Sequence, residues 1–152
     1  MALAMRQSVA VATILARLGL GSSFLSAVAD RLGLWGVYGS PHVAWGDFAR
    51  FTAYTAKLNS FLPASCIPAL AWTATYVEVA LGIALLLGLF TRLTAFASGI
   101  LLLLFGFSMA VALGVKSPLD ASVFSASAAA FLLAATEKYP VSIDSLKAAL
   151  HS

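Results

Sequence analysis

The sequence has few of the residues that build metal and redox centres. Its 152 residues include one cysteine, Cys66, and two histidines, His42 and His151, which lie far apart. A single cysteine excludes an intramolecular disulfide, a CxxC redox pair and a cysteine-rich metal site. Both histidines lie outside the apolar segments, so a histidine-ligated haem or metal ion is not expected.

Charged residues are also scarce. They make up 10% of the chain, and apolar residues make up 61%. Soluble domains contain about 25% charged and about 45 to 50% apolar residues, so this composition indicates a membrane protein. The net charge of +3 comes from nine scattered Lys and Arg against six Asp and Glu. Because they form no basic run, nucleic-acid binding is not expected.

The long apolar segments predict an all-α, polytopic membrane protein that forms one domain over residues 1–152. A hydrocarbon layer of about 30 Å requires a helix of about 20 residues. Four segments have that length, and they cover residues 8–29, 68–90, 92–115 and 118–136. The sequence therefore predicts four transmembrane helices in an antiparallel bundle. The second and third are separated by Thr91 and Arg92 alone, which makes them antiparallel neighbours.

Two further segments predict helices too short to span. From Asp47, a suitable N-cap, apolar residues recur at helical spacing, which predicts an amphipathic helix over about 47–62. We expect it to lie in the membrane interface between spans one and two. It follows a loop rich in glycine and interfacial aromatics, including Trp35, Tyr38 and Trp45. Residues 142–150 predict a short amphipathic tail. Ser117 followed by Pro118 predicts the N-cap of the fourth span.

Four spans place both termini on one side of the membrane. The basic residues outside the spans or at their ends divide evenly, with Arg6, Arg92, Lys138 and Lys147 on the terminal side and Arg31, Arg50, Lys57 and Lys116 on the other. We predict cytoplasmic termini because Arg6 precedes the first span and Arg92 lies in a short turn. The positive-inside bias acts most strongly at such places.

Two charged residues, Arg17 and Glu78, lie near the middle of predicted spans. A charged group at mid-bilayer costs about 2.5 to 3.5 kcal/mol on insertion scales, so such residues are usually buried and paired. Arg17 lies about 14 Å and Glu78 about 18 Å from the terminal side. The similar depth predicts a pair. The candidate site adds the small and hydroxyl residues on the same helix faces, which are Thr13, Gly21, Thr75 and Gly82.

The role of this predicted pair stays open between two main interpretations. It is either a structural ion pair that determines which helix faces which, or the lining of a polar pocket that holds a ligand head group or carries protons. A pair exposed to lipid is a third alternative. Gly21 and Gly82, one turn from Arg17 and Glu78, favour a close approach of the two helices.

Several motifs, in this order, resemble the DoxX family of small four-helix membrane proteins. They are Arg17-Leu-Gly19 followed by Phe24, the segment from Leu58 to Pro63, the stretch from Glu78 through Gly82 to Arg92, and the tail from Tyr139 to Asp144. The resemblance covers most of the chain. It implies a multi-pass protein of the bacterial inner membrane that is associated with redox systems.

By this resemblance, the chain is an accessory subunit of a redox system that contacts quinone through Arg17 and Glu78. The residues contain no nucleophile with a base and no cofactor fingerprint, so at most the chain is a subunit of a quinone-linked oxidoreductase. Besides the lipid bilayer, the implied partner is a membrane or peripheral redox protein. The alternative is a structural or assembly protein that binds another membrane protein. The sequence does not decide between a monomer and a homo-oligomer.

Overall fold

Helices make up the regular structure of the chain. The computed structural model describes residues 2–150, and no strand occurs among them, which confirms the all-α prediction. Residues 1, 151 and 152 of the predicted domain lie outside this range. Three segments are long and apolar enough to cross a membrane: Gln7–Arg31, Ala64–Leu87 and Thr91–Leu113. They correspond to α1 (Ala2–Arg31), α3 (Ile67–Leu87, preceded by the 3-10 turn Ala64–Cys66) and α4 (Thr91–Leu113).

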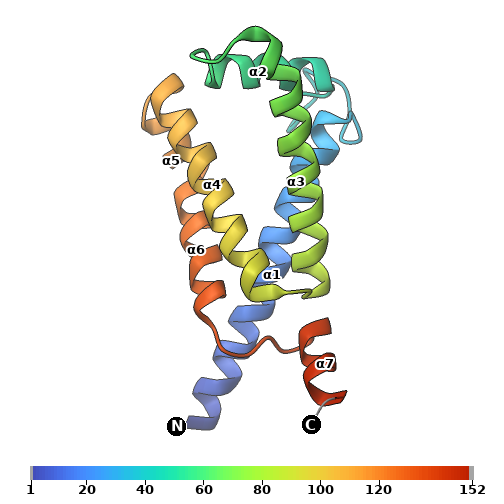
Figure 1. Cartoon of the computed structure of the whole chain (residues 1–152), viewed down its shortest axis with the longest axis vertical. Coiled ribbons are helices and arrows are strands. Elements are labelled where there is room, and N and C mark those ends of the chain that lie inside the picture. Colours follow the sequence, from blue (N-terminus) through green and yellow to red (C-terminus); the bar gives the residue numbers. More distant parts are fainter. Residues whose placement is uncertain (1, 151–152) are drawn as a thin grey trace.

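The long helices form two closely packed pairs, α1 with α3 and α4 with α6 (Val123–Ala135) (Figure 1). In the antiparallel pair α1 and α3, Gly21 and Gly82 lie at the contact. A Cβ atom on Gly21 would lie 2.9 Å from the carbonyl oxygen of Gly82. Only glycine allows this backbone approach. The predicted close approach at these two glycines is therefore confirmed.

In the second pair, the glycines of α4 leave space for aromatic rings of α6. A Cβ atom on Gly99 would lie 2.8 Å from the ring of Phe131, and one on Gly106 would lie 2.6 Å from the ring of Phe124. Ser127 Oγ donates a hydrogen bond of 2.8 Å to the carbonyl oxygen of Gly99. Small residues on α4 thus bring α6 close along its length.

The turn between α3 and α4 begins earlier than predicted. Gly88 ends α3 in the left-handed conformation, with φ of +66°, and its amide bonds back to carbonyls of the last turn. A left-handed glycine is a common helix terminator because it has no Cβ to clash. α3 therefore ends at Leu87 instead of Phe90, and α4 begins at Thr91.

The predicted fourth span, residues 118–136, is not one continuous helix. It is divided into α5 (Lys116–Asp120) and α6, because Ser122 adopts the left-handed conformation with φ of +56°. The predicted N-cap at Ser117 is wrong, since Ser117 lies inside α5 and the N-cap position is Val115. α6 has 13 residues and is about 20 Å long, which is short for a layer of about 30 Å.

α2 (Phe48–Leu58) lies across the end of the bundle opposite the termini (Figure 1). We call this end the cap end and the other the terminal end. The predicted N-cap is confirmed, because the Asp47 carboxylate accepts a 2.8 Å hydrogen bond from the amide of Arg50. Phe48 of α2 stacks on Trp72 of α3 with ring centroids 4.0 Å apart, which joins the cap to the bundle.

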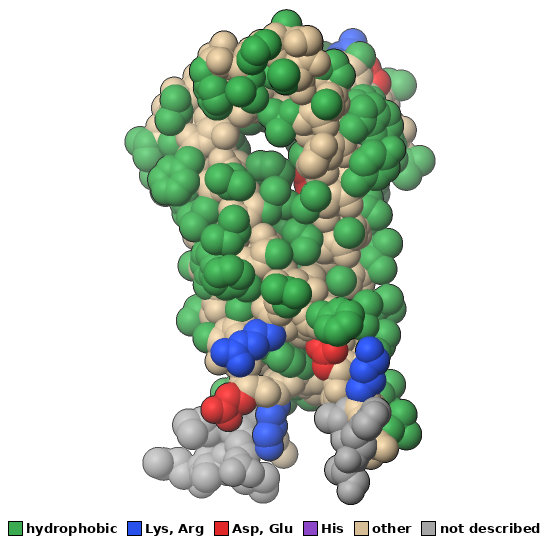
Figure 2. All heavy atoms as spheres, viewed as in Figure 1, with side chains coloured by type: hydrophobic (Ala, Val, Ile, Leu, Met, Phe, Trp, Pro, Cys, Tyr) green, Lys and Arg blue, Asp and Glu red, His purple; other side chains and the backbone are tan. Residues whose placement is uncertain are grey.

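The surface of the bundle is apolar along its sides (Figure 2). Large hydrophobic side chains stand almost fully exposed on the helices, among them Val111, which is 83% exposed. Lys and Arg side chains gather at the terminal end (Figure 2). An apolar belt bounded by charge is the surface expected of a chain whose sides contact lipid.

The glycine contact predicts opposite effects for two neighbouring substitutions in α1. Gly21→Ala should lower the free energy of unfolding by about 1 to 3 kcal/mol, because the new methyl group meets the backbone of α3. Gly19→Ala is the matched control, since a Cβ there has no heavy atom within 4 Å. It should be neutral or stabilising by up to about 1 kcal/mol through helix propensity. Thermal and denaturant unfolding in detergent would measure both, and equal effects would contradict the contact.

Candidate functional site

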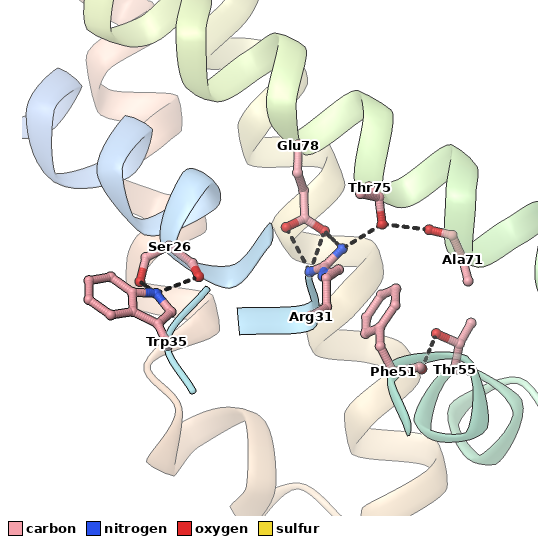
Figure 3. Close-up of polar contacts among 8 residues, drawn as sticks. All are labelled: Ser26, Arg31, Trp35, Phe51, Thr55, Ala71, Thr75 and Glu78. Atoms are coloured by element: carbon pink, nitrogen blue, oxygen red, sulfur yellow. Dashed lines mark hydrogen bonds and ion pairs between the residues drawn. The ribbon is translucent and has the colours of Figure 1, made fainter. Parts of the chain in front are cut away.

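Glu78 forms a buried ion pair with Arg31, the last residue of α1 (Figure 3). Arg31 Nη2 lies 3.0 Å from Glu78 Oε2 and 3.1 Å from Oε1, and Nη1 lies 3.1 Å from Oε1. Nη1 also donates to Thr75 Oγ1 at 3.0 Å, and Thr75 donates in turn to the carbonyl oxygen of Ala71 at 2.8 Å. Arg31 and Glu78 are only 2% and 1% exposed. The carboxylate therefore has both oxygens occupied by its own chain.

Aromatic rings from the cap cover the guanidinium of Arg31. Its Cζ atom lies 3.8 Å from the ring centroid of Phe51 in α2 and 5.4 Å from that of Trp45. Arginine stacks well on such rings because its planar charge is weakly hydrated and is attracted by the π face. The ion pair consequently joins α1, α3 and α2, and the rings separate it from water.

Asp30 positions these rings by holding the preceding loop. Its carboxylate accepts hydrogen bonds from three consecutive amides, those of Ala44 at 2.8 Å, Trp45 at 3.1 Å and Gly46 at 2.9 Å. Gly46 adopts a φ of +69°, which turns the chain directly into the N-cap of α2. Two adjacent residues of α1 therefore make different contacts. Asp30 binds the backbone of the loop, and Arg31 stacks on the rings of Trp45 from the loop and Phe51 from α2.

Arg17 lies elsewhere and bonds only to carbonyl oxygens. Its Nε and Nη2 donate to Leu85 and Leu86 near the end of α3, each at 3.0 Å. Its Nη1 donates to Pro140 at 3.0 Å and to Val141 at 2.9 Å. The terminal carbonyls of a helix lack partners within the helix, and they favour a nearby cation. Arg17 therefore ties the C-terminal segment to the end of α3.

The predicted pairing of Arg17 with Glu78 is wrong, and the register of α1 against α3 explains why. Gly21 lies against Gly82, so Arg17, one turn earlier, reaches Leu85 and Leu86. Glu78 is seven residues from Leu85 in α3, a separation of about 10 Å. The depths estimated from the ends of the predicted spans did not resolve this difference.

Asp144 binds the start of α4, close to where Arg17 binds the end of α3. Its carboxylate accepts hydrogen bonds from the amides of Phe90 at 2.9 Å and Thr91 at 2.7 Å, and so caps α4 from α7 (Ile143–Leu150). Partial burial by itself would raise the pKa of Asp144, but the hydrogen bonds from Thr91 and Phe90 outweigh it, and the pKa is lowered. The capped α4 therefore favours the ionised carboxylate.

The structure separates the six residues of the predicted site. Thr75 and Glu78 do lie together, with Arg31 as their partner. Gly21 and Gly82 form the helix contact. Thr13 donates to the carbonyl oxygen of Val9 in its own helix at 2.8 Å. Whether any of these residues contacts a cofactor remains a prediction.

Sequence reasoning missed the roles of Asp30, Arg31 and Asp144. From the sequence, Arg31 is counted only among the basic residues on the side of the membrane opposite the termini, and Asp30 is given no role. A usable signal is that Thr75 and Glu78 share one face of α3, toward the end where the first span stops. That signal would have suggested a long basic side chain folding back from the end of α1.

A family model described as DoxX matches residues 12–110, more than half of the chain. The match includes Arg17, Asp30, Arg31 and Glu78, and it stops within α4. No curated protein and no solved structure matches the chain.

Breaking the buried Arg31–Glu78 ion pair should lower the free energy of unfolding strongly. Glu78→Gln leaves the charge of Arg31 buried without compensation, and we expect a loss of about 3 to 5 kcal/mol in the free energy of unfolding. Arg50→Gln is the control, because the Arg50–Asp47 pair is 52% and 41% exposed, and its loss should cost less than about 1 kcal/mol. Unfolding in detergent would measure both. The double change Arg31→Met with Glu78→Leu should recover much of the loss, and equal stability of Glu78→Gln and the parent would refute the pair's importance.

The lowered pKa of Asp144 predicts a pH dependence at the terminal end. Because the folded pKa lies below the unfolded value of about 3.9, the carboxylate stabilises the fold above that pH and stops doing so as the pH falls through the folded pKa. Hydrogen exchange of the Phe90 and Thr91 amides, corrected for intrinsic rates, should show protection lost on acidification. In Asp144→Asn, the protection of these two amides should already be reduced at neutral pH, and it should change little on acidification. Unchanged protection in that variant would exclude the cap.

Proposed function

The chain belongs to the DoxX family, and from this premise we propose that it is an integral-membrane accessory subunit of a redox system, whose cap end docks a partner protein. In this proposal the chain does not itself carry the reacting groups. It supplies a membrane anchor and a shaped surface next to the partner's centre. The membrane is the bacterial inner membrane, with the termini on the cytoplasmic side, and α5 and α6 together make the fourth crossing.

The buried charged side chains bond to groups of the same chain, and this supports an accessory role. Arg17, Asp30, Arg31 and Glu78 are the buried charged side chains among residues 7–147, and each bonds within the chain. A side chain that acts as a general acid or base must lie within hydrogen-bond reach of the substrate atom with which it exchanges a proton. Both oxygens of Glu78 instead bond Arg31, and three nitrogens of Arg17 bond carbonyls.

The redox part of the proposal draws on the family resemblance. Accessory subunits of this kind serve partners that exchange electrons with quinone. A quinone would then bind where the chain meets its partner, and Arg17 and Glu78 would hold the helices in place. This assigns to the two residues a positioning role instead of direct contact with the quinone ring.

The cap end offers the docking surface. In its loop and in the segment after α2, five large apolar or aromatic side chains are more than half exposed, from 59% for Tyr38 to 75% for Leu34; they are Leu34, Trp35, Val37, Tyr38 and Phe61. We call them the cap surface. Exposed aromatic residues are enriched in protein interfaces. The guanidinium of Arg50 lies 4.5 Å from the ring centroid of Tyr38, but its charge is offset by the ion pair with Asp47. The exposed Lys57 of α2 supplies the net positive charge, which favours a partner with an acidic face.

The second candidate is a structural or assembly protein that binds another membrane protein and has no redox role. The closed Arg31–Glu78 pair favours this candidate equally, because a structural pair serves either function. The two candidates differ in what the docked partner does. Only the redox proposal requires that the partner's quinone-dependent activity depend on this chain.

Photo-crosslinking in native membranes tests the docking. A benzoylphenylalanine at Tyr38 should crosslink one protein that carries a redox cofactor, and the crosslink should weaken when Arg50 and Lys57 are reversed to Glu. The same probe at Val111, on the side of the bundle, is the matched control and should not capture that protein. Deletion of the chain should lower the partner's quinone reductase activity several-fold. Equal capture at both positions would exclude the cap surface, and a captured partner with unchanged activity would leave the assembly role.

A further inference from the structure

A groove on the side of the bundle lies between α4 and α6 at the terminal end. It has a volume of about 470 Å³ and is lined by Arg92, Leu93, Phe96, Phe131, Ala134 and Ala135. We propose that this groove binds an anionic glycerophospholipid, with the phosphate on the guanidinium of Arg92 and an acyl chain along the two phenylalanine rings.

The groove follows from how α4 and α6 pack. Gly99 and Ser127 bring the helices together, and Gly99 seats the ring of Phe131. Phe96 meets Phe131 edge to face with centroids 5.6 Å apart, so the two rings form a continuous apolar wall. Nearer the terminal end, α6 presents only the small side chains of Ala134 and Ala135. The space that larger residues would fill is left open as a groove.

The groove faces the surroundings of the bundle. Leu93 is 69% exposed and Phe96 is 52% exposed, and both are large apolar residues in α4, the candidate span with the highest mean hydropathy of the three. In water this exposure would be unfavourable by about 25 cal/mol for each Å² of apolar surface. A hydrocarbon chain is the occupant that matches such a lining.

Arg92 lies where a lipid head group would be. It is the second residue of α4, whose 23 residues span about 35 Å, slightly more than the hydrocarbon layer of about 30 Å. Arg92 has no ion-pair partner within residues 2–150. Glu137 and Lys138, which are consecutive in the segment after α6, offset each other in charge. A guanidinium binds a phosphate through two parallel hydrogen bonds.

The combination distinguishes an anionic lipid from other ligands. A free anion would not use the apolar wall, and a detergent tail would not use the guanidinium. In a zwitterionic lipid the choline cation partly cancels the attraction of the phosphate. Basic pockets between membrane helices near the boundary are typical sites for anionic head groups.

Native mass spectrometry of the full chain in neutral detergent tests the site with two lipids of matched acyl chains, phosphatidylglycerol and phosphatidylcholine. We expect the parent to bind phosphatidylglycerol more tightly. Arg92→Gln should lower that affinity about fivefold, as expected for one basic residue at a membrane surface. It should leave the affinity for phosphatidylcholine nearly unchanged. Ala135→Phe, which fills the groove, should weaken binding of both lipids.

Lys116→Gln, at the cap end, is the matched charge control and should bind both lipids as the parent does. Unfolding temperatures of all variants, measured in the same detergent without added lipid, show whether each variant is folded. Arg92 and Ala135 are exposed, so both variants should fold. The proposal is overturned if the parent binds the two lipids equally, if Lys116→Gln reduces the binding as much as Arg92→Gln, or if folded Ala135→Phe binds like the parent.

Discussion

The requirement that a charge away from water have its partners within the protein organises this fold. Arg31 meets it with a carboxylate, a hydroxyl and two aromatic rings, supplied by α3, α2 and the loop before α2. Removing the carboxylate or the hydroxyl would leave polar atoms unsatisfied in an apolar setting, where each costs several kcal/mol. The position of α2 across the cap end is therefore a consequence of where α1 places one guanidinium.

The terminal end is held by the same principle with different partners. Arg17 donates hydrogen bonds to carbonyls at the end of α3 and in the segment before α7. Asp144 accepts hydrogen bonds from the amides at the start of α4. The turn between α3 and α4 thus has a cation at the helix end it leaves and an anion at the helix start it enters, which suits both helix dipoles. Between the two polar ends, the helices meet at glycines and small residues and around a hydrophobic core of Leu20, Phe24, Leu85, Ala95, Ala130, Leu133 and Ala134.

The sequence predicts the elements better than their partners. Apolar segments of spanning length predict the three long helices, Asp47 predicts the start of α2, and the glycines predict where α1 meets α3. The partner of Glu78 was beyond reach because depth from a span boundary carries an error of several residues, which is comparable to the separation of about 10 Å between Glu78 and the carbonyl of Leu85 that Arg17 reaches. The division of the fourth segment was also hidden, since Ser122 is neither glycine nor proline and gives no composition signal of a break.

The contacts of α1 also set an order for the chain's entry into the membrane. α1 is made before its partners, because Glu78 follows Arg31 by 47 positions. Leu85 and Leu86 follow Arg17 by 68 and 69 positions, and Pro140 and Val141 follow it by 123 and 124. A newly inserted α1 therefore holds two arginines whose partners have not yet been synthesised. Until α3 arrives, the translocation machinery or the lipid head groups must supply those partners, and the bonds of Arg17 are complete only after Pro140 and Val141 have been made.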